Sequence, residues 1–194
     1  VYPGFHALSL WGPLDMFGSL SPAVSVLLIG SRDGPVASAN GPAALADVAM
    51  GESPRLDLLL IPGGERSEEI GSAETLDWLR WRAADAEIVM AVGTGVGLVA
   101  GAGLLDGRRA TANPDDLSSL VAAHARVRWV TGARWIDDGK FVTSSGGLVG
   151  VDMALAVIGR LTGQRVAATL ADRSGYSWIR LPGSPRAHRP DELR

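Results

Sequence analysis

The chain has 194 residues, of which 46% are hydrophobic and 20% are charged, and its formal net charge at pH 7 is −3. This size and composition suit one soluble globular domain, and they predict neither nucleic-acid nor membrane binding. No apolar run reaches the length of a membrane span and no signal peptide is evident, so we expect a cytoplasmic protein. The absence of cysteine excludes disulfides, thiolate metal sites and thiol catalysis, and the three histidines are too dispersed to predict a metal site.

Four apolar segments predict buried strands, because short aliphatic runs bounded by turn residues are typical of parallel strands covered on both faces. Residues 1–2 are interpreted as the end of a strand, and residues 24–29, 56–61 and 87–92 as three further strands. The last two runs end at the turn Pro62-Gly63-Gly64 and at Gly93.

Helical patterns fall between and after these strands. Asn113 is a good N-cap, followed by a proline and two acidic residues that favour a first turn, and Gly103 suits a C-terminal cap. The segments interpreted as helices are residues 73–84, 94–102, a helix beginning at Asn113, and residues 150–161 and 164–171.

The last part of the sheet is predicted to be a hairpin. Residues 127–130 and 134–136 read as strands, and Asp138-Gly139 is a good hairpin turn before a strand over residues 140–143. The alternation of strands and helices indicates an α/β fold: a flavodoxin-like open, mostly parallel sheet with helices on both faces. We expect one domain over residues 1–182 and an arm or disordered tail over residues 183–194.

Chemistry is expected at the carboxyl edge of this sheet, where ligands bind in such folds. Three glycine-containing loops should converge there: residues 62–65, 93–95 and 144–147. Glycines allow backbone N–H groups to approach a ligand, and the amides after Gly93 open a helix, which favours negative charge. We therefore predict an oxyanion cradle, although each loop could also serve only to turn the chain.

Several motifs together resemble the ThiJ/PfpI superfamily, and most of all its isonitrile hydratase branch and the amidotransferase-like sensor domains of AraC-type regulators. The resemblance spans nearly the whole chain in the expected order. The motifs that carry it are residues 10–15 (Leu-Trp-Gly-Pro-Leu-Asp), 57–64 (Asp-Leu-Leu-Leu-Ile-Pro-Gly-Gly), 91–95 (Ala-Val-Gly-Thr-Gly), 102–111, 143–146 and 150–155.

The chain also departs from that family at the positions that carry its chemistry. The resemblance places a cysteine nucleophile where this chain has Gly93, and an acid that contacts that thiol where it has Ser9. Asn113 aligns with a usual histidine, and Leu148 stands where small or hydroxyl residues are usual. Thiol-dependent chemistry therefore cannot be transferred to this chain.

Three side chains are candidates for proton transfer. Glu65 directly follows the Gly63-Gly64 turn and could have a raised pKa if partly buried, but it could also be a solvated loop acid. Asp15 follows a Gly-Pro pair, where capping a helix is the competing explanation. His6 could move protons near neutral pH, or could simply be an exposed loop residue.

The substrate-binding candidates share a place in the same loops. Trp11 and Leu148, together with Val149, are expected to make the site apolar, and Asn113 could act only as a helix cap. The full set is Ser9, Trp11, Gly64, Gly93, Thr94, Asn113, Ser144 and Leu148.

Two classes of function remain, and the first is favoured. One is a cofactor-independent enzyme of the isomerase, cyclase, lyase or hydratase type, acting non-covalently on a small apolar metabolite. The other is a non-catalytic binding or sensor module. No cofactor motif is visible. The resemblance implies a homodimer, and four tryptophans could supply its interface: Trp78, Trp81, Trp129 and Trp135.

Overall fold

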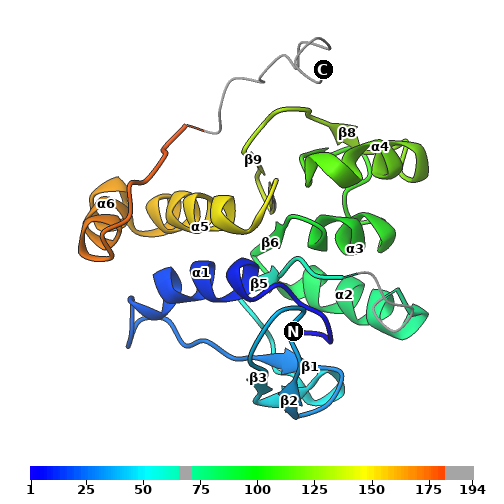
Figure 1. Ribbon diagram of the computed structural model, residues 1–194, viewed down its shortest axis with the longest axis horizontal. Helices are drawn as coiled ribbons and strands as arrows, with labels where there is room; N and C mark the ends of the chain where they lie inside the picture. Colours follow the sequence, from blue (N-terminus) through cyan, green and yellow to red (C-terminus); the bar gives the residue numbers. More distant parts are fainter. Residues whose placement is uncertain (66–70, 182–194) are drawn as a thin grey trace.

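The computed structural model describes residues 1–65 and 71–181 (Figure 1). Its helices are α1 (Ala7–Gly18), the short 3₁₀ helix η1 (Met50–Glu52), α2 (Ala73–Asp85), α3 (Gly95–Gly101), α4 (Pro114–Ala123), α5 (Gly147–Thr162) and α6 (Gln164–Arg173). Its strands are β1 (Ile29–Gly30), β2 (Gly34–Val36), β3 (Ala44–Ala46), β4 (Val48–Ala49), β5 (Leu58–Ile61), β6 (Ile88–Val92), β7 (Arg109–Ala110), β8 (Arg128–Trp129), β9 (Trp135–Asp138) and β10 (Phe141–Ser144). The tail assigned from residue 183 onward lies outside the described residues.

The central sheet has the strand order β5-β6-β10-β9. Strands β5, β6 and β10 run parallel, and β9 pairs antiparallel with β10 through the turn at Gly139. The predicted late hairpin and the mostly parallel sheet are therefore confirmed. Shorter two-stranded pairs join β1 with β4, β2 with β3, and β7 with β8.

Helices cover both faces of the central sheet, as expected. Val89 and Ala91 of β6 point into a core shared with α2, α3 and α4, whereas Met90 and Val92 point into a core shared with α1, α5 and α6. Figure 1 shows these two groups of helices on opposite sides of β5 and β6. Because alternate residues of a strand face opposite sides, the uninterrupted apolar run of β6 buries both faces at once.

Most predicted elements are confirmed within a few residues. Asn113 caps α4 by accepting a hydrogen bond from the Asp115 N–H (3.2 Å), with Pro114 at the first helical position. Gly103 follows α3 with φ of +74°, the left-handed conformation that a helix C-terminus favours. Helix α5 begins three residues before the predicted start, at Gly147.

Three expectations at the amino-terminal end are wrong. Residues 1–2 were expected to end a strand, but they lie in no strand. Of residues 24–29, only Ile29 lies in a strand, because β1 is the two-residue segment Ile29–Gly30. Asp15 does not begin a helix: it is exposed and lies within α1, which starts at Ala7 and contains Pro13. The Gly-Pro pair concealed this helix, since proline usually marks a helix boundary.

No helix in the described part of the chain is both long enough and apolar enough to cross a membrane.

Candidate functional site

The elbow between β6 and α3 has Gly93 at its apex. Gly93 is buried with φ of +56°, and its N–H donates to the Ser144 carbonyl of β10 (2.8 Å). A Cβ placed on Gly93 would have the Gly146 Cα as its nearest neighbour, at 3.6 Å, which is an ordinary contact. The apex therefore has space for a side chain, but its backbone conformation strongly favours glycine.

The loop after β5 is bonded directly to this elbow. The Gly64 N–H donates to the Thr94 hydroxyl (2.7 Å), and that hydroxyl lies 2.7 Å from the Gly64 carbonyl, to which it can donate. A Cβ on Gly64 would lie 2.7 Å from the Gly4 carbonyl oxygen, so this position has no room for a side chain. The Gly64 amide, expected to be part of an oxyanion cradle, is already satisfied within the protein.

The amides of Thr94 and Gly95 differ from that of Gly64. No acceptor for either N–H is present within residues 1–65 and 71–181, and Thr94 makes no side-chain cap to α3. Gly95 is held tightly, because a Cβ there would lie 2.3 Å from the Pro62 carbonyl oxygen. These two N–H groups are therefore the part of the predicted cradle that is not used within the described residues.

The first loop supports the elbow from the other side. The His6 N–H donates to the Gly63 carbonyl (2.7 Å), and the Ser9 hydroxyl lies 2.7 Å from the His6 carbonyl and 3.1 Å from the Gly63 carbonyl. Ser9 is buried, and its proton is used within the protein rather than offered to a substrate. His6 is partly exposed at the start of α1, where its side chain makes no cap.

Glu65 lies on the rim of this region and is exposed. Its N–H donates to the Gly4 carbonyl (2.9 Å), and this bond fixes the backbone of Glu65. The partly buried carboxylate that the sequence suggested is therefore not present, although Glu65 does adjoin the glycine turn at the active edge.

The two large apolar candidates do not enclose a site. Trp11 on α1 is 44% exposed and Leu148 on α5 is 61% exposed. Leu8, also exposed and on α1, lies beside the start of α5, because a Cβ on Gly147 would be 3.5 Å from the Leu8 side chain. Ser144 is fully buried, and its hydroxyl has no hydrogen-bond partner among the described residues.

The tryptophans expected at a dimer interface are mostly engaged inside the molecule. Trp135 is buried, Trp78 donates to the Met50 carbonyl (2.8 Å), and Trp129 donates to the His124 carbonyl (3.2 Å). Trp81 is 52% exposed and stacks against the Arg82 guanidinium. A homodimer stays a prediction.

Tyr2 is a neighbour of the site that sequence reasoning missed, because it was interpreted only as the end of a strand. Its hydroxyl donates to the Pro62 carbonyl (2.8 Å), and its ring packs where a Gly64 side chain would stand. Burial raises the pKa of this phenol far above its ordinary value, so Tyr2 stays neutral and remains a hydrogen-bond donor. A tyrosine two residues before a glycine gives no sequence signal for this role.

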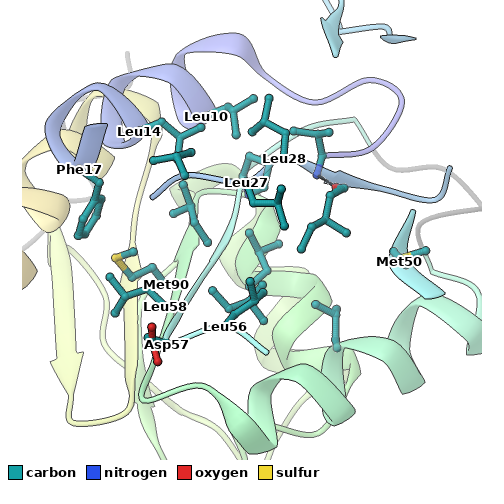
Figure 2. Close-up of a pocket in the computed structure, with 18 of the residues that line it drawn as sticks. Leu10, Leu14, Phe17, Leu27, Leu28, Met50, Leu56, Asp57, Leu58 and Met90 are labelled. Atoms are coloured by element: carbon teal, nitrogen blue, oxygen red, sulfur yellow. Dashed lines mark hydrogen bonds between the residues drawn. The ribbon is translucent and has the colours of Figure 1, made fainter. Parts of the chain in front are cut away.

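A large cavity lies away from the elbow. It measures about 770 Å³ and lies between residues 23–29, α1 and β5 (Figure 2). Neither Gly93, Thr94 nor Ser144 lines it. No group of three or more acidic or histidine side chains that could hold a metal occurs in the described ranges.

Comparison with protein-family models gives a match to the DJ-1/PfpI family over residues 1–160. Isonitrile hydratase of Pseudomonas putida is 35% identical over 167 residues, which is 84% of this chain and 70% of that protein. The HTH-type transcriptional regulator CdhR of Pseudomonas aeruginosa is 28% identical over 153 residues, which is 79% of this chain but only 45% of the regulator.

Solved structures agree with these relatives. A ThiJ/PfpI family protein from Pseudomonas syringae superposes with a TM-score of 0.84 at 31% identity, covering 95% of this chain and 74% of that one. Drosophila melanogaster DJ-1beta superposes with a TM-score of 0.81 at 21% identity, covering 92% of this chain and 96% of that one, and this match concerns the fold alone.

Proposed function

The chain belongs to the DJ-1/PfpI family, and from this premise we propose that it binds a small molecule at the Gly93 elbow without forming a covalent bond to it. The observation that carries the proposal is the apex itself. Gly93 offers no nucleophile, whereas the next two N–H groups, those of Thr94 and Gly95, have no acceptor within the described protein. The elbow can therefore hold an electron-rich atom but cannot attack it.

The ligand class follows from what surrounds these amides. Two neighbouring N–H donors suit a carbonyl oxygen, a carboxylate or another compact acceptor. Gly146 borders the apex, and the next residue, Gly147, lies against the exposed Leu8, so an apolar body can rest on Leu8 and Leu148. We propose a small, mostly apolar molecule with one polar end, which is also the ligand class favoured by the sequence.

A second candidate is the cofactor-independent enzyme of the isomerase, cyclase, lyase or hydratase type. It is favoured by the 35% identity to an isonitrile hydratase. In this version Glu65 transfers a proton to or from a ligand held by the Thr94 and Gly95 amides. We place it second, because Glu65 is exposed and because the Gly64 amide and the Ser9 hydroxyl are used within the protein.

The test uses cyclohexyl isocyanide and N-cyclohexylformamide, the product of adding water to it. Each is titrated into the ¹⁵N-labelled protein while the amide resonances are followed. Binding at the elbow should shift the Thr94 and Gly95 resonances in a saturable way and leave Gly103, at the far end of α3, unchanged. No shift at Thr94 and Gly95 with either probe or with a metabolite extract contradicts the proposal.

Mass spectrometry of the same mixtures separates binding from catalysis. Turnover that falls about 100-fold or more in Glu65→Gln supports proton transfer by Glu65. The matched control is Glu74→Gln, since Glu74 is an exposed glutamate on α2 and belongs to none of the three glycine-containing loops. Saturable shifts without conversion support the binding module and reject the enzyme.

A further inference from the structure

A second helix begins beside the Gly93 apex. Helix α5 follows β10 as α3 follows β6, and because β6 and β10 are parallel, both helices start at the carboxyl edge of the sheet, on opposite faces of it (Figure 1). The two starts adjoin, since a Cβ on Gly93 would lie 3.6 Å from the Gly146 Cα. Gly146 is the N-cap of α5, so the first turns of both helices border one place.

The first turn of α5 carries unpaired backbone donors. The N–H groups of Gly147, Leu148 and Val149 have no acceptor within residues 1–65 and 71–181, and Gly146 provides no side-chain cap. The first bond within the helix runs from the Gly150 N–H to the Gly146 carbonyl (3.0 Å). Because α5 has 16 residues, its peptide dipoles add up along the axis, and its amino-terminal end favours negative charge.

Ser144 places a buried hydroxyl under this turn. Its side chain is fully buried, and the hydroxyl has no hydrogen-bond partner among the described residues. Ser144 pairs in register with Val92, so both side chains lie on one face of the sheet, and the Val92 methyl carbons lie 3.2 Å from the position of a Cβ on Gly150 of α5. The hydroxyl therefore faces the start of α5. Folded proteins seldom leave a buried hydroxyl without a partner, so this one indicates a polar ligand there.

The place between the two helix starts is open. No described atom lies within 4 Å of a Cβ built on Gly146, and the Gly146 Cα is the only one within 4 Å of a Cβ built on Gly93. A compact group above these two glycines would meet unpaired N–H groups on both sides, those that open α3 and those that open α5. Two sets of donors suit a ligand with two acceptor atoms.

The surrounding charges favour an anion of single charge. Asp152 of α5 is fully buried, is paired with Arg134, and accepts hydrogen bonds from the Tyr176 hydroxyl (3.1 Å) and the Ile179 N–H (2.9 Å). Its negative charge is therefore compensated and does not oppose the helix dipole. Glu65 at the rim is exposed, so solvent screens its charge. Because Arg134 is used by Asp152, a monoanion suits the place better than a dianion such as phosphate.

We propose that the polar end of the elbow ligand is a carboxylate that bridges the two helix starts. One carboxylate oxygen accepts from the Thr94 and Gly95 N–H groups. The other accepts from the Gly147 and Leu148 N–H groups. The inference rests on the function proposed above, and it narrows the ligand from any compact acceptor to an ionised carboxylic acid with an apolar body.

The experiment titrates cyclohexanecarboxylate and cyclohexanecarboxamide into the ¹⁵N-labelled protein. The two probes have the same ring and nearly the same shape, but only the first is charged. We expect the carboxylate to bind about 10-fold or more tightly than the carboxamide, because hydrogen bonds to a charged acceptor are the stronger ones. It should shift the Gly147 and Leu148 amide resonances together with those of Thr94 and Gly95.

Gly147→Pro tests the half of the site that α5 supplies. Proline is accepted at the first position of a helix, and the extended backbone of Gly146 (φ −178°, ψ 175°) suits a following proline, so the substitution removes one donor. Gly147→Ala is the matched control, because it adds a Cβ at the same point, 3.5 Å from the Leu8 side chain, but keeps the N–H. We expect Gly147→Pro to bind the carboxylate about 10-fold more weakly than Gly147→Ala does.

Equal affinity of the unsubstituted protein for both probes would overturn the inference, and so would equal affinity of the two Gly147 variants for the carboxylate. Shifts confined to Thr94 and Gly95 would overturn it and leave the proposed function intact. Shifts confined to Gly147 and Leu148 would overturn both the bridge and the proposed binding at the elbow. The comparison of the two probes uses the unsubstituted protein, so it decides the matter even where Gly147→Pro does not fold.

Discussion

The elbow and the cavity between residues 23–29 and β5 both adjoin strand β5, yet they are built in opposite ways. At its carboxyl end, the chain is so crowded that a Cβ on Gly95 would clash with the Pro62 carbonyl and a Cβ on Gly64 would clash with Tyr2 and the Gly4 carbonyl. Along its free edge, the molecule holds a cavity of about 770 Å³ between unpaired backbone edges. The cavity and the candidate site are therefore separate regions, because Gly93, Thr94 and Ser144 do not line the cavity.

The largest effect is expected where the elbow is most crowded. Gly95→Ala places a Cβ 2.3 Å from the Pro62 carbonyl oxygen and 2.9 Å from that of Ile61, so β5 and α3 must separate. We expect the free energy of unfolding to fall by about 3 kcal/mol or more. Thermal denaturation measures this as a loss of roughly 6 to 12 °C in Tm.

Gly97→Ala is the matched control, because Gly97 lies two residues further along the same helix. Its Cβ would meet only the end of the Leu120 side chain, at 3.3 Å, and alanine has the higher helix propensity. The unfolding free energy should change by less than about 1 kcal/mol. Similar losses of unfolding free energy in both variants would mean that the contact of residue 95 with Pro62 is not the cause of the destabilisation.

The sequence predicted the central sheet because β5 and β6 are apolar runs that end at glycine-containing turns. Such runs can be recognised without knowing which strands pair with them. It failed for residues 24–29, which have the same apolar pattern. A strand exists only when another edge pairs with it, and the cavity of about 770 Å³ lies between this segment and β5. Pattern predicts the tendency to form a strand, whereas pairing decides the outcome.

The candidate site was predictable in its position but less so in its bonding. The glycine turns at 62–64 and 93–95 identified the sheet edge, because their spacing after two strands requires them to meet there. Which amides are free could not be read from sequence. It depends on the Thr94 hydroxyl reaching Gly64 and on Ser9 reaching Gly63, and both contacts join segments more than 25 residues apart.

The smallest change in stability, and the sharpest test of the elbow, is expected from Gly93→Cys. The new Cβ has ordinary space beside Gly146, so the cost comes mainly from φ of +56° and should be roughly 1 to 2 kcal/mol. Amides near a sulfur stabilise its thiolate, so the Thr94 and Gly95 N–H groups should lower the thiol pKa below that of a free cysteine. The rate of alkylation by iodoacetamide as a function of pH measures this thiol pKa.

Gly103→Cys is the control, because Gly103 has φ of +74° and open space. A thiol at residue 93 that titrates like the one at 103 would show that these amides do not stabilise negative charge, and the proposed ligand site would lose its physical basis.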